Sequence, residues 1–373
     1  MELLPSEELA SPMPIALRLP LEIIHIIFNN LNFENQIQFR LVCTYFFAEC
    51  PITNLFWMGK HKSKMTDKIL KLYPHAHYLN AWDNQSITNV NHMKNLRGLV
   101  ARYNCGIDDE GISSLSNLIC LDASENPKIK NINHLTNLCI LDAGGNCGIG
   151  NKEILLLTLL KDLYAHKNLG ITNVNHLANL RLLNARSYCG IDNDGISLLT
   201  NLTELDLGSN RIITTIKHLS NLQILNLEFN RMISDNEIFS LSNLTSLDIS
   251  DTSKITNHGI RHLTNLTNLN SGNNQQITDI NHLTNLCILH AYGIECGISD
   301  RGISKLIGLT KLNAGDNFEI TNLNHMSNLQ SLMASERSGI NDEGISRLTN
   351  LTELYIRGNN QITKGKYANI IKS

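Results

Sequence analysis

The sequence has little of what a membrane-bound or nucleic-acid-binding protein would show. Charged residues make up only 17% of 373 residues, the net charge is -3 at pH 7, and the pI is about 6.5. This balance provides no basic surface for nucleic acid or anionic lipid. No apolar run reaches the roughly 18 residues of a membrane span, and the N-terminus lacks the cationic start and apolar core of a signal peptide. We therefore expect a protein of the cytoplasm or nucleus that binds neither membrane nor nucleic acid.

The residue constellations of catalysis are also absent. The chain has no glycine-rich phosphate loop, and no serine or cysteine nucleophile is placed beside a convincing base. We therefore expect no enzymatic activity and no cofactor.

The chain instead contains one phrase many times. Residues 201–222 read NLTELDLGSNRIITTIKHLSNL, and similar units succeed one another along most of the sequence. Their first residues are Ala76, Leu96, Leu118, Leu138, Leu160, Leu180, Leu202, Leu222, Leu244, Leu266, Leu286, Leu309, Leu329 and Leu351. The spacing alternates between 20 and 22 residues up to Leu222, and the unit at Leu286 is longer than its neighbours. So regular a spacing of repeats over so long a stretch is not expected by chance.

The phrase follows the pattern of a leucine-rich repeat, L-x-x-L-x-L-x-x-N-x-x-I, in which each unit supplies one strand and one return segment. A single unit cannot bury its apolar edge, so neighbouring units must stack. The predicted fold class is α/β: a curved leucine-rich-repeat solenoid of about 14 repeats of 20–23 residues, preceded by a small helical domain.

Two columns of small or polar residues fit the interior of this solenoid. Five positions after each first residue the strand points inward, and alanine is frequent there; it becomes Leu207, Leu227 and Ile249 further on. Three positions later comes a column of asparagines, whose amides can tie the turning backbone to its neighbours when buried. We predict this structural role for Asn84, Asn104, Asn126, Asn146, Asn168, Asn210, Asn230, Asn274, Asn317 and Asn359.

The return segments are of two kinds. Short ones resemble residues 129–138, IKNINHLTNL, whereas long ones resemble residues 107–118, IDDEGISSLSNL. The two extra residues of the long kind include Asp and Gly, which favours a capped turn of helix on the convex side.

Cysteines and histidines recur with the repeats. Cys105, Cys147 and Cys189 are 42 residues apart, and Cys296 begins a matching C-G-I. Equivalent positions two repeats apart are separated by about 10 Å, whereas a disulfide requires Cα atoms within about 7 Å. The same spacing prevents one metal ion from being shared along the histidine column. We predict buried reduced thiols, and structural roles for His92, His134, His176, His218, His262, His282 and His325.

The head of the chain is predicted to form helices that carry more apolar residues than a small domain can bury. A helix from Pro20 to about Asn30 would carry one stripe of Ile23, Ile27 and Leu31 and a second of Ile24 and Phe28, with Ile26 widening the apolar sector. Further helices are predicted at about 34–43 and 45–49. A domain of roughly 45 residues buries too little to cover both stripes, so the spare one packs either on a partner or on the first repeats.

The head resembles the F-box, a family whose motif reads L-P-x-E, I-F-x-x-L, L-V-C-x-x-F and a closing Trp. The residues at these positions are Leu19-Pro20, Glu22, Ile27-Phe28, Leu31, Leu41-Val42-Cys43, Phe46 and Trp57. Asn35-Gln36 and Thr44 depart from the usual residues. The resemblance implies a three-helix unit that docks on a Skp-family adaptor, and through it on a cullin-RING ubiquitin ligase. The contact residues it implies are Leu19, Pro20, Ile23, Ile27, Leu31, Leu41, Val42 and Cys43.

The expected organisation has four parts. Residues 1–15 form a disordered N-terminus, 16–59 the F-box, 60–75 a helical joint that caps the first repeat, and 76–373 the solenoid. In the joint, Ile69, Leu70 and Leu72 can cover the open end of the first repeat. Such a joint would hold the head and the repeats in a fixed orientation.

Strand side chains two, four and six positions after each first residue should face the concave surface. Tryptophan and arginine among amides have the composition of an interface hot spot. We predict that a protein target lies there, with Trp82, Arg102, Tyr164, His166 and Arg186 in contact with it.

The architecture that this resemblance implies is that of a substrate-receptor subunit of an SCF-type ubiquitin ligase, with the F-box on the adaptor and the solenoid on the target. The alternative is a binding scaffold, or a decoy that sequesters the adaptor. The abundance of Asn and Ile suits an AT-rich genome, such as that of an amoeba or of an amoebal giant virus acting in its host's cytoplasm. Composition identifies neither the target nor the source.

Overall fold

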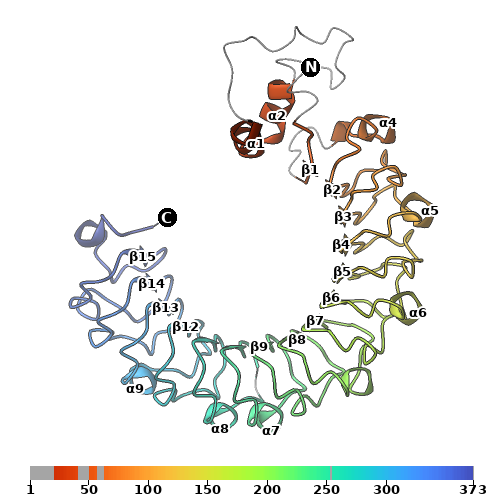
Figure 1. Ribbon diagram of the computed structural model, residues 1–373. Coiled ribbons are helices and arrows are strands. Elements are labelled where there is room, and N and C mark those ends of the chain that lie inside the picture. The colour runs from red at the N-terminus through yellow and green to blue at the C-terminus, as the bar shows by residue number, and fades with distance from the viewer. Residues whose placement is uncertain (1–20, 41–49, 57–62, 253, 373) are drawn as a thin grey trace. The chain divides into compact units, whose positions relative to one another are not determined.

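The computed structural model describes residues 21–40, 50–56, 63–252 and 254–372. The chain divides into two compact units, Met1–Ile171 and Thr172–Ser373. The first contains the helices of the head and strands β1–β6, and the second contains β7–β15 (Figure 1).

Apart from the two longer helices of the head, each unit alternates short strands with turns and single helical turns. The elements of the first unit are α1 (Leu21–Asn29), α2 (Phe33–Arg40), β1 (Asn54–Leu55), α4 (Asp67–Leu70), β2 (Tyr78–Asn80), β3 (Gly98–Val100), α5 (Asp109–Ile112), β4 (Cys120–Asp122), β5 (Ile140–Asp142), α6 (Asn151–Ile154) and β6 (Asp162–Tyr164). Those of the second are β7 (Leu182–Asn184), η2 (Asp194–Ile196), β8 (Glu204–Asp206), β9 (Ile224–Asn226), α7 (Asp235–Ile238), β10 (Ser246–Asp248), α8 (Asn257–Ile260), β11 (Asn268–Asn270), β12 (Ile288–His290), α9 (Asp300–Ile303), β13 (Lys311–Asn313), β14 (Ser331–Met333), β15 (Glu353–Tyr355) and η3 (Lys364–Tyr367).

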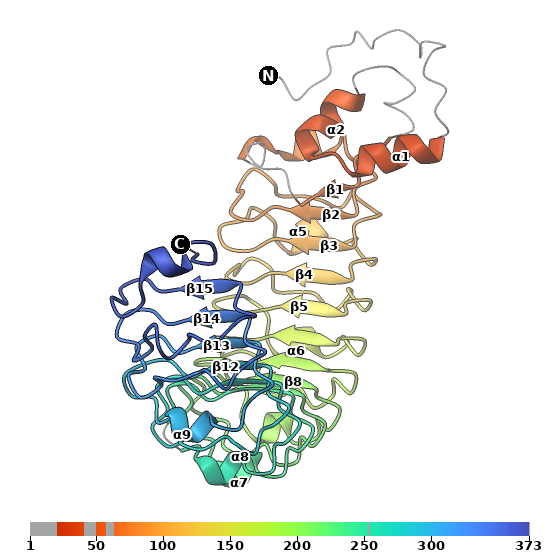
Figure 2. The ribbon, with the colours of Figure 1, turned by 90° about the vertical axis from the view of Figure 1, so that its left-hand side faces the viewer.

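The strands confirm the predicted repeat register. Within each unit they pair in parallel and in chain order, and Figure 2 shows β1–β5 stacked in this way. Each strand from β2 to β15 begins two residues after the first residue of its predicted repeat, as in Leu118 and β4. In the second unit the strands line one side of the coil, and α7, α8 and α9 lie on the other (Figure 1).

The core follows the alternation of each strand. The middle strand residue and the residue five positions after the repeat start are buried, as Leu121 and Ala123 are, with 0% of each exposed. Leu207, Leu227 and Ile249 are equally buried, as predicted. The residues between them face outward, and we call the surface formed by positions two, four and six the concave face.

The buried asparagines connect each repeat to the one before it. Asn168 donates from Nδ2 to the carbonyls of Ala143 (2.7 Å) and Ile149 (3.1 Å), and its Oδ1 accepts from the amides of Gly170 and Ile171. Equivalent bonds are made by Asn126, Asn210, Asn230, Asn274, Asn317 and Asn359. The predicted structural role is therefore confirmed for these positions.

The same prediction is wrong for Asn104 and Asn146, which are exposed. In these repeats the next residue, Cys105 or Cys147, turns inward instead. The Cys147 thiol donates to the Ala143 carbonyl at 3.0 Å, and its sulfur accepts from Asn168 Nδ2 at 3.3 Å. A cysteine of one repeat thus accompanies the buried asparagine of the next, as Cys189 accompanies Asn210, which explains the 42-residue period.

A left-handed residue ends every strand segment. Seven positions after each repeat start φ is positive, and eleven of these residues within the described chain are not glycine; Glu125 (φ 57°) and Lys167 (φ 57°) are examples. Such a conformation costs roughly 1–2 kcal/mol in a non-glycine residue. It lets the amide of the next residue close a turn, as Asn126 does onto the Ala123 carbonyl at 3.1 Å.

Most of the long return segments form the predicted helical turns, but residues 340–351 form turns without a helix. Asp108 caps α5 by accepting from the Gly111 amide at 3.0 Å, and the 20-residue repeats have no helix at this place within the described residues. A Cβ on Gly111 would lie 2.1 Å from the Thr88 carbonyl oxygen of the preceding repeat. Close approach of two backbones therefore explains the D-x-G-I form of these segments.

The histidine column packs against backbone. Nε2 of His134, His218, His282 and His325 lies 3.0–3.2 Å from an isoleucine carbonyl of the preceding repeat. The structural role predicted for these four side chains is confirmed.

Short segments cover the open edges of the sheet. The joint at 60–75 was predicted as a cap of the first repeat, whereas the strand β1 was not predicted. At the start, β1 pairs with β2, and Met65 is fully buried beside the joint helix. At the end, the amide of Lys372 donates to the Leu354 carbonyl, and the Leu354 amide donates to the Ile370 carbonyl. Covering these edges protects unpaired backbone groups from other chains.

The Asn ladder makes a prediction about stability. Replacing Asn168 with alanine leaves buried carbonyls without donors, and we expect a loss of about 2 kcal/mol or more in the free energy of unfolding. Replacing exposed Asn146 should change it by less than about 0.5 kcal/mol. Urea unfolding followed by circular dichroism measures both; equal losses would contradict the assignment of Asn146 to the surface.

Burial also predicts which thiols react. Burial raises the pKa of Cys147 and of Cys296 to about 11, so roughly one thiol in a thousand is ionised at pH 8. Cys287 is exposed and should be alkylated before Cys147 and Cys296 under native conditions. Mass-spectrometric mapping after brief iodoacetamide treatment, with a urea-unfolded sample as control, tests this order. Modification of Cys147 as fast as Cys287 in the native protein would contradict it.

Candidate adaptor and target interfaces

Helix α1 directs its two apolar stripes to different faces. Ile24 and Phe28 are buried, and Phe28 packs on Phe39 of α2 with ring centroids 5.8 Å apart. Ile23 and Ile27 keep 42% and 40% of their surface exposed, and Ile26 keeps 57%. The alternative in which the spare stripe packs on the first repeats therefore does not hold for these residues, and an apolar strip remains open on α1.

Of the other residues in the predicted adaptor set, the structure describes only Leu31. Leu31 is half-buried after the end of α1. Leu19, Pro20, Leu41, Val42 and Cys43 lie outside the described residues, as do Thr44, Trp57 and the predicted helix at 45–49.

The departure at Asn35-Gln36 has a local structural explanation. Gln36 Nε2 donates to the Phe28 carbonyl at 3.1 Å, and the Asn35 amide donates to Asn32 Oδ1 at 2.9 Å. These bonds hold the start of α2 against the end of α1. Asn35 itself is exposed.

The head contacts the joint through aromatic rings. Phe33 and Tyr73 are both buried, with centroids 6.3 Å apart, and burial raises the pKa of the Tyr73 hydroxyl while the Arg40 charge opposes this shift. Leu70 of α4 is fully buried, as predicted. Leu72 is 41% exposed, so the prediction that it covers the first repeat is wrong.

The column of Asp and Asn four positions after each repeat start is structural. Each side chain accepts from the backbone amide two residues later: Asp142 Oδ1 from Gly144 at 2.9 Å, and Asp206 Oδ1 from Gly208 at 2.8 Å. Asn80, Asp122, Asn184, Asn226, Asp248, Asn270 and Asn313 do the same. This structural role was not predicted from the sequence, although the restriction of the column to Asp and Asn was its signal.

Trp82 and Arg102 form one cluster with Tyr103, a residue that sequence reasoning missed. The Arg102 guanidinium lies 4.8 Å from the centroid of Tyr103 and 6.0 Å from that of Trp82, and it pairs with Asp122 at 3.6 Å. Trp82 and Tyr103 remain 48% and 41% exposed. The cluster therefore presents aromatic surface with a cation held in place.

Tyr164 and His166 lie on one strand segment of the first unit, and both are half-buried. The His166 ring lies over Gly144 of the preceding repeat, where a Cβ would approach within 2.1 Å of Cε1. Gly144 thus leaves the space that the ring occupies.

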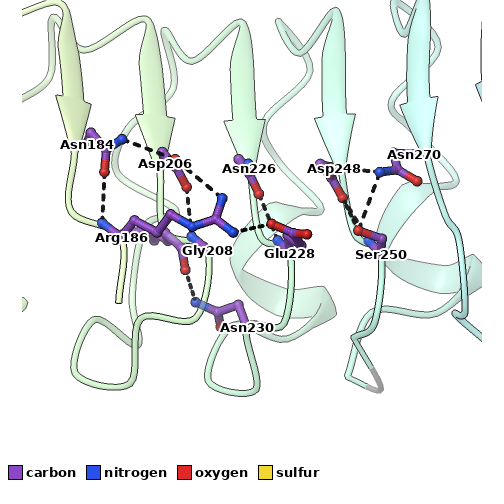
Figure 3. Close-up of polar contacts among 11 residues, drawn as sticks. Asn184, Arg186, Asp206, Gly208, Asn226, Glu228, Asn230, Asp248, Ser250 and Asn270 are labelled. Carbon is purple, nitrogen blue, oxygen red and sulfur yellow. Dashed lines mark hydrogen bonds and ion pairs between the residues drawn. The ribbon is translucent and has the colours of Figure 1, made fainter. Parts of the chain in front are cut away.

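Arg186, in the second unit, is bound by acidic neighbours (Figure 3). It pairs with Glu228 and lies 3.9 Å from Asp206 Oδ2. Its guanidinium passes over Gly208, where a Cβ would lie 3.1 Å from Cζ. Figure 3 also shows a separate group on the next strands, in which Asp248 accepts from Ser250 Oγ and from Asn270 Nδ2. Arg186 is therefore partly neutralised within the chain.

A second column of asparagines lies just before the strands and lines a groove in the second unit. This groove has a volume of about 520 Å³, and its lining includes Asn179, Asn201, Asn221 and Asn243. Asn201 Nδ2 donates to the Ala178 carbonyl at 3.2 Å, and Asn221 to that of Thr200 at 2.8 Å. These amides brace adjacent repeats.

Comparison with known proteins separates the head from the repeats. Residues 16–47 match the model of the F-box domain. The head is an F-box. The further boundaries predicted for the F-box, the joint and the N-terminus stay predictions. No curated protein is detectably similar to the chain.

The repeats are similar in structure to bacterial leucine-rich-repeat proteins. An internalin (InlF) of Listeria monocytogenes is 24% identical with a TM-score of 0.50, over 83% of this chain and 85% of the other. A leucine-rich-repeat protein of Leptospira interrogans is 21% identical with a TM-score of 0.51, over 83% and 99%. The functional domain of InlJ from Listeria monocytogenes, which includes a cysteine ladder, is 20% identical with a TM-score of 0.51, over 79% and 72%.

These findings confirm an F-box joined to a leucine-rich-repeat solenoid. That architecture is typical of non-enzymatic adaptors and receptors, and F-boxes generally bind Skp-family adaptors. None of the helices in the described part of the chain is long and apolar enough to cross a bilayer.

The carboxylates of the concave face predict a pH dependence. Burial raises the pKa of Asp142, with the neighbouring Asp122 adding to this, so the ionised form is disfavoured in the folded state. The penalty is absent below the ordinary aspartate pKa of 3.8 and complete above the raised value. Asp142→Asn keeps the acceptor for Gly144 and removes the charge.

We therefore expect Asp142→Asn to raise the thermal midpoint at pH 7 and to leave it unchanged below about pH 4. Asp142→Ala, which also removes the acceptor, serves as the comparison and should lower the midpoint. Thermal unfolding across this pH range measures the effect; a gain by Asp142→Asn that is equal at all pH values would refute its electrostatic origin.

Proposed function

We propose that the protein is a substrate-recognition subunit of an SCF-type cullin-RING ubiquitin ligase. The F-box binds a Skp-family adaptor through the open strip of α1, and the solenoid holds a protein target on its concave face. The protein itself performs no chemistry: joining the target to the ligase raises its effective concentration there.

The observation that carries the proposal is the strip of Ile23, Ile26 and Ile27. A nine-residue helix that buries Ile24 and Phe28 and still exposes three isoleucines has an apolar face without a partner in the described chain. Such faces mark protein interaction sites. Two of these isoleucines belong to the adaptor set that the F-box motif implies, together with Leu19, Pro20, Leu31, Leu41, Val42 and Cys43.

The target side of the proposal rests on Trp82, Arg102, Tyr164, His166 and Arg186. The exposed rings of Trp82 and Tyr103 beside a held arginine have the composition of a binding hot spot. The reaction is expected in the cytoplasm or nucleus, where the ligase operates.

Charge on α1 should abolish adaptor binding. Ile23→Asp with Ile27→Asp places two carboxylates in the apolar contact, and we expect affinity for a Skp-family adaptor to fall by about 30-fold or more. Leu72→Asp is a matched control, because Leu72 is equally exposed but lies outside the F-box. Affinity purification of the full chain should recover adaptor and cullin with the parent and Leu72 variants only.

The same experiment separates the alternative, a scaffold or decoy. A decoy would retain the adaptor, but proteins held by the solenoid would have the same half-life with the parent chain and with the Ile23/Ile27 variant. Failure of the parent chain to recover any adaptor would leave only the scaffold.

A further inference from the structure

A cavity of about 300 Å³ opens in the second unit where β9, β10 and β11 end. None of the residues predicted for target binding lines it. Its lining is polar apart from one aromatic ring and comprises Phe229, Arg231, Asp251, Thr252, Asn273, Gln275, Gln276 and Glu295.

The cavity is built by the left-handed turn residues of successive repeats. Phe229, Asp251 and Asn273 have φ of 54°, 54° and 51°, so equivalent positions of three repeats supply its wall. Asn273 Nδ2 donates to Asp251 Oδ1 at 3.2 Å and fixes that carboxylate. A Cβ on Gly293 would lie 1.9 Å from Asn273 Oδ1, so glycine there leaves space for the amide. The lining is therefore held in place before any ligand arrives.

Charge and surface in the cavity favour a cation. The carboxylates of Asp251 and Glu295 outnumber the one cation of its lining, Arg231. The charges of Glu228, Asp248 and Glu295 add to burial in raising the pKa of the Asp251 carboxyl. An incoming positive group would relieve this repulsion. Phe229 is 50% exposed, and an exposed ring beside carboxylates can stack on a guanidinium or ammonium group.

The donors do not suit a metal ion. Two carboxylates among amides, a hydroxyl, a phenyl ring and the Arg231 guanidinium provide few strong ligands. Within the described residues no three His, Cys, Asp or Glu side chains gather as a metal site requires. A flat organic cation fits the ring and the carboxylates together.

We propose that this cavity receives a lysine or arginine side chain from a basic segment of a protein target. The proposal rests on the proposed function in taking the solenoid as the target-binding part, and it names the chemistry of the segment bound. Arg186, being paired with Glu228 and near Asp206, does not repel such a segment as a free cation would.

The test uses the full chain and a fluorescein-labelled peptide of alternating arginine and serine, followed by fluorescence anisotropy. We expect Asp251→Asn to weaken binding about tenfold, since a charge-assisted bond is lost while the acceptor for Asn273 is kept. Phe229→Ala should weaken it about threefold. A glutamate–serine peptide of equal length should not bind.

Asp316→Asn is the matched control. Asp316 is the left-handed residue of another repeat (φ 56°), is half-buried as Asp251 is, and lies outside the cavity lining. Its loss changes net charge equally and should leave the dissociation constant unchanged. Equal weakening by Asp316→Asn, or no binding of the arginine peptide to the parent chain, overturns the proposal; circular dichroism confirms that the variants are folded.

Failure here is distinguishable from failure of the proposed function. If the Asp251→Asn variant recovers adaptor, cullin and the same solenoid-bound proteins as the parent, the receptor function stands and the cavity is not its basic-residue site. If the peptide binds as expected but no adaptor is recovered, the cavity stands and the ligase does not.

Discussion

Parallel pairing between three-residue strands is the constraint on which the solenoid depends. A strand of this length cannot persist alone, so its amides and carbonyls must be matched by the next repeat in strict register. Buried side chains extend this matching beyond the strand. Asn168 bonds to the carbonyls of Ala143 and Ile149, and the Cys147 thiol occupies the equivalent place in the alternate repeat. The backbone of each repeat is thus completed by its neighbour.

The sequence pattern was sufficient to predict the elements that recur from repeat to repeat. Periodic leucines predicted the strand positions, and D-x-G-I predicted most of the helical turns, because both patterns recur many times along the chain. The prediction was wrong where either of two neighbouring residues could occupy the same interior position. Asn104 and Cys105 were both candidates for the interior, and only the turn geometry selects the cysteine. The start of the solenoid was mispredicted for a related reason: β1 is made by non-repeating residues, and Leu72 lies where α4 has already ended.

The concave face was harder to predict, since its residues serve two purposes. Residue type indicated Trp82 and Arg102, but not that Tyr103 would complete their cluster, because its direction is set by a positive φ. Arg186 has the composition of a contact residue, yet its contacts with Asp206 and Glu228 lie within the chain. Only the three-dimensional structure distinguishes side chains that support the sheet from those that remain available to a binding partner. On α1 the distinction is simpler, because inward and outward stripes alternate along one helix.

The left-handed turn gives the molecule a row of interchangeable positions. Its backbone strain arises from the path of the coil and is borne whichever L-residue stands there, so the fold exerts little preference among side chains. Aspartate, tyrosine, glutamate, lysine, serine and phenylalanine all occur in the row. A protein of this kind can therefore change which partner it binds by exchanging a single residue per repeat, while the backbone of the repeats stays the same.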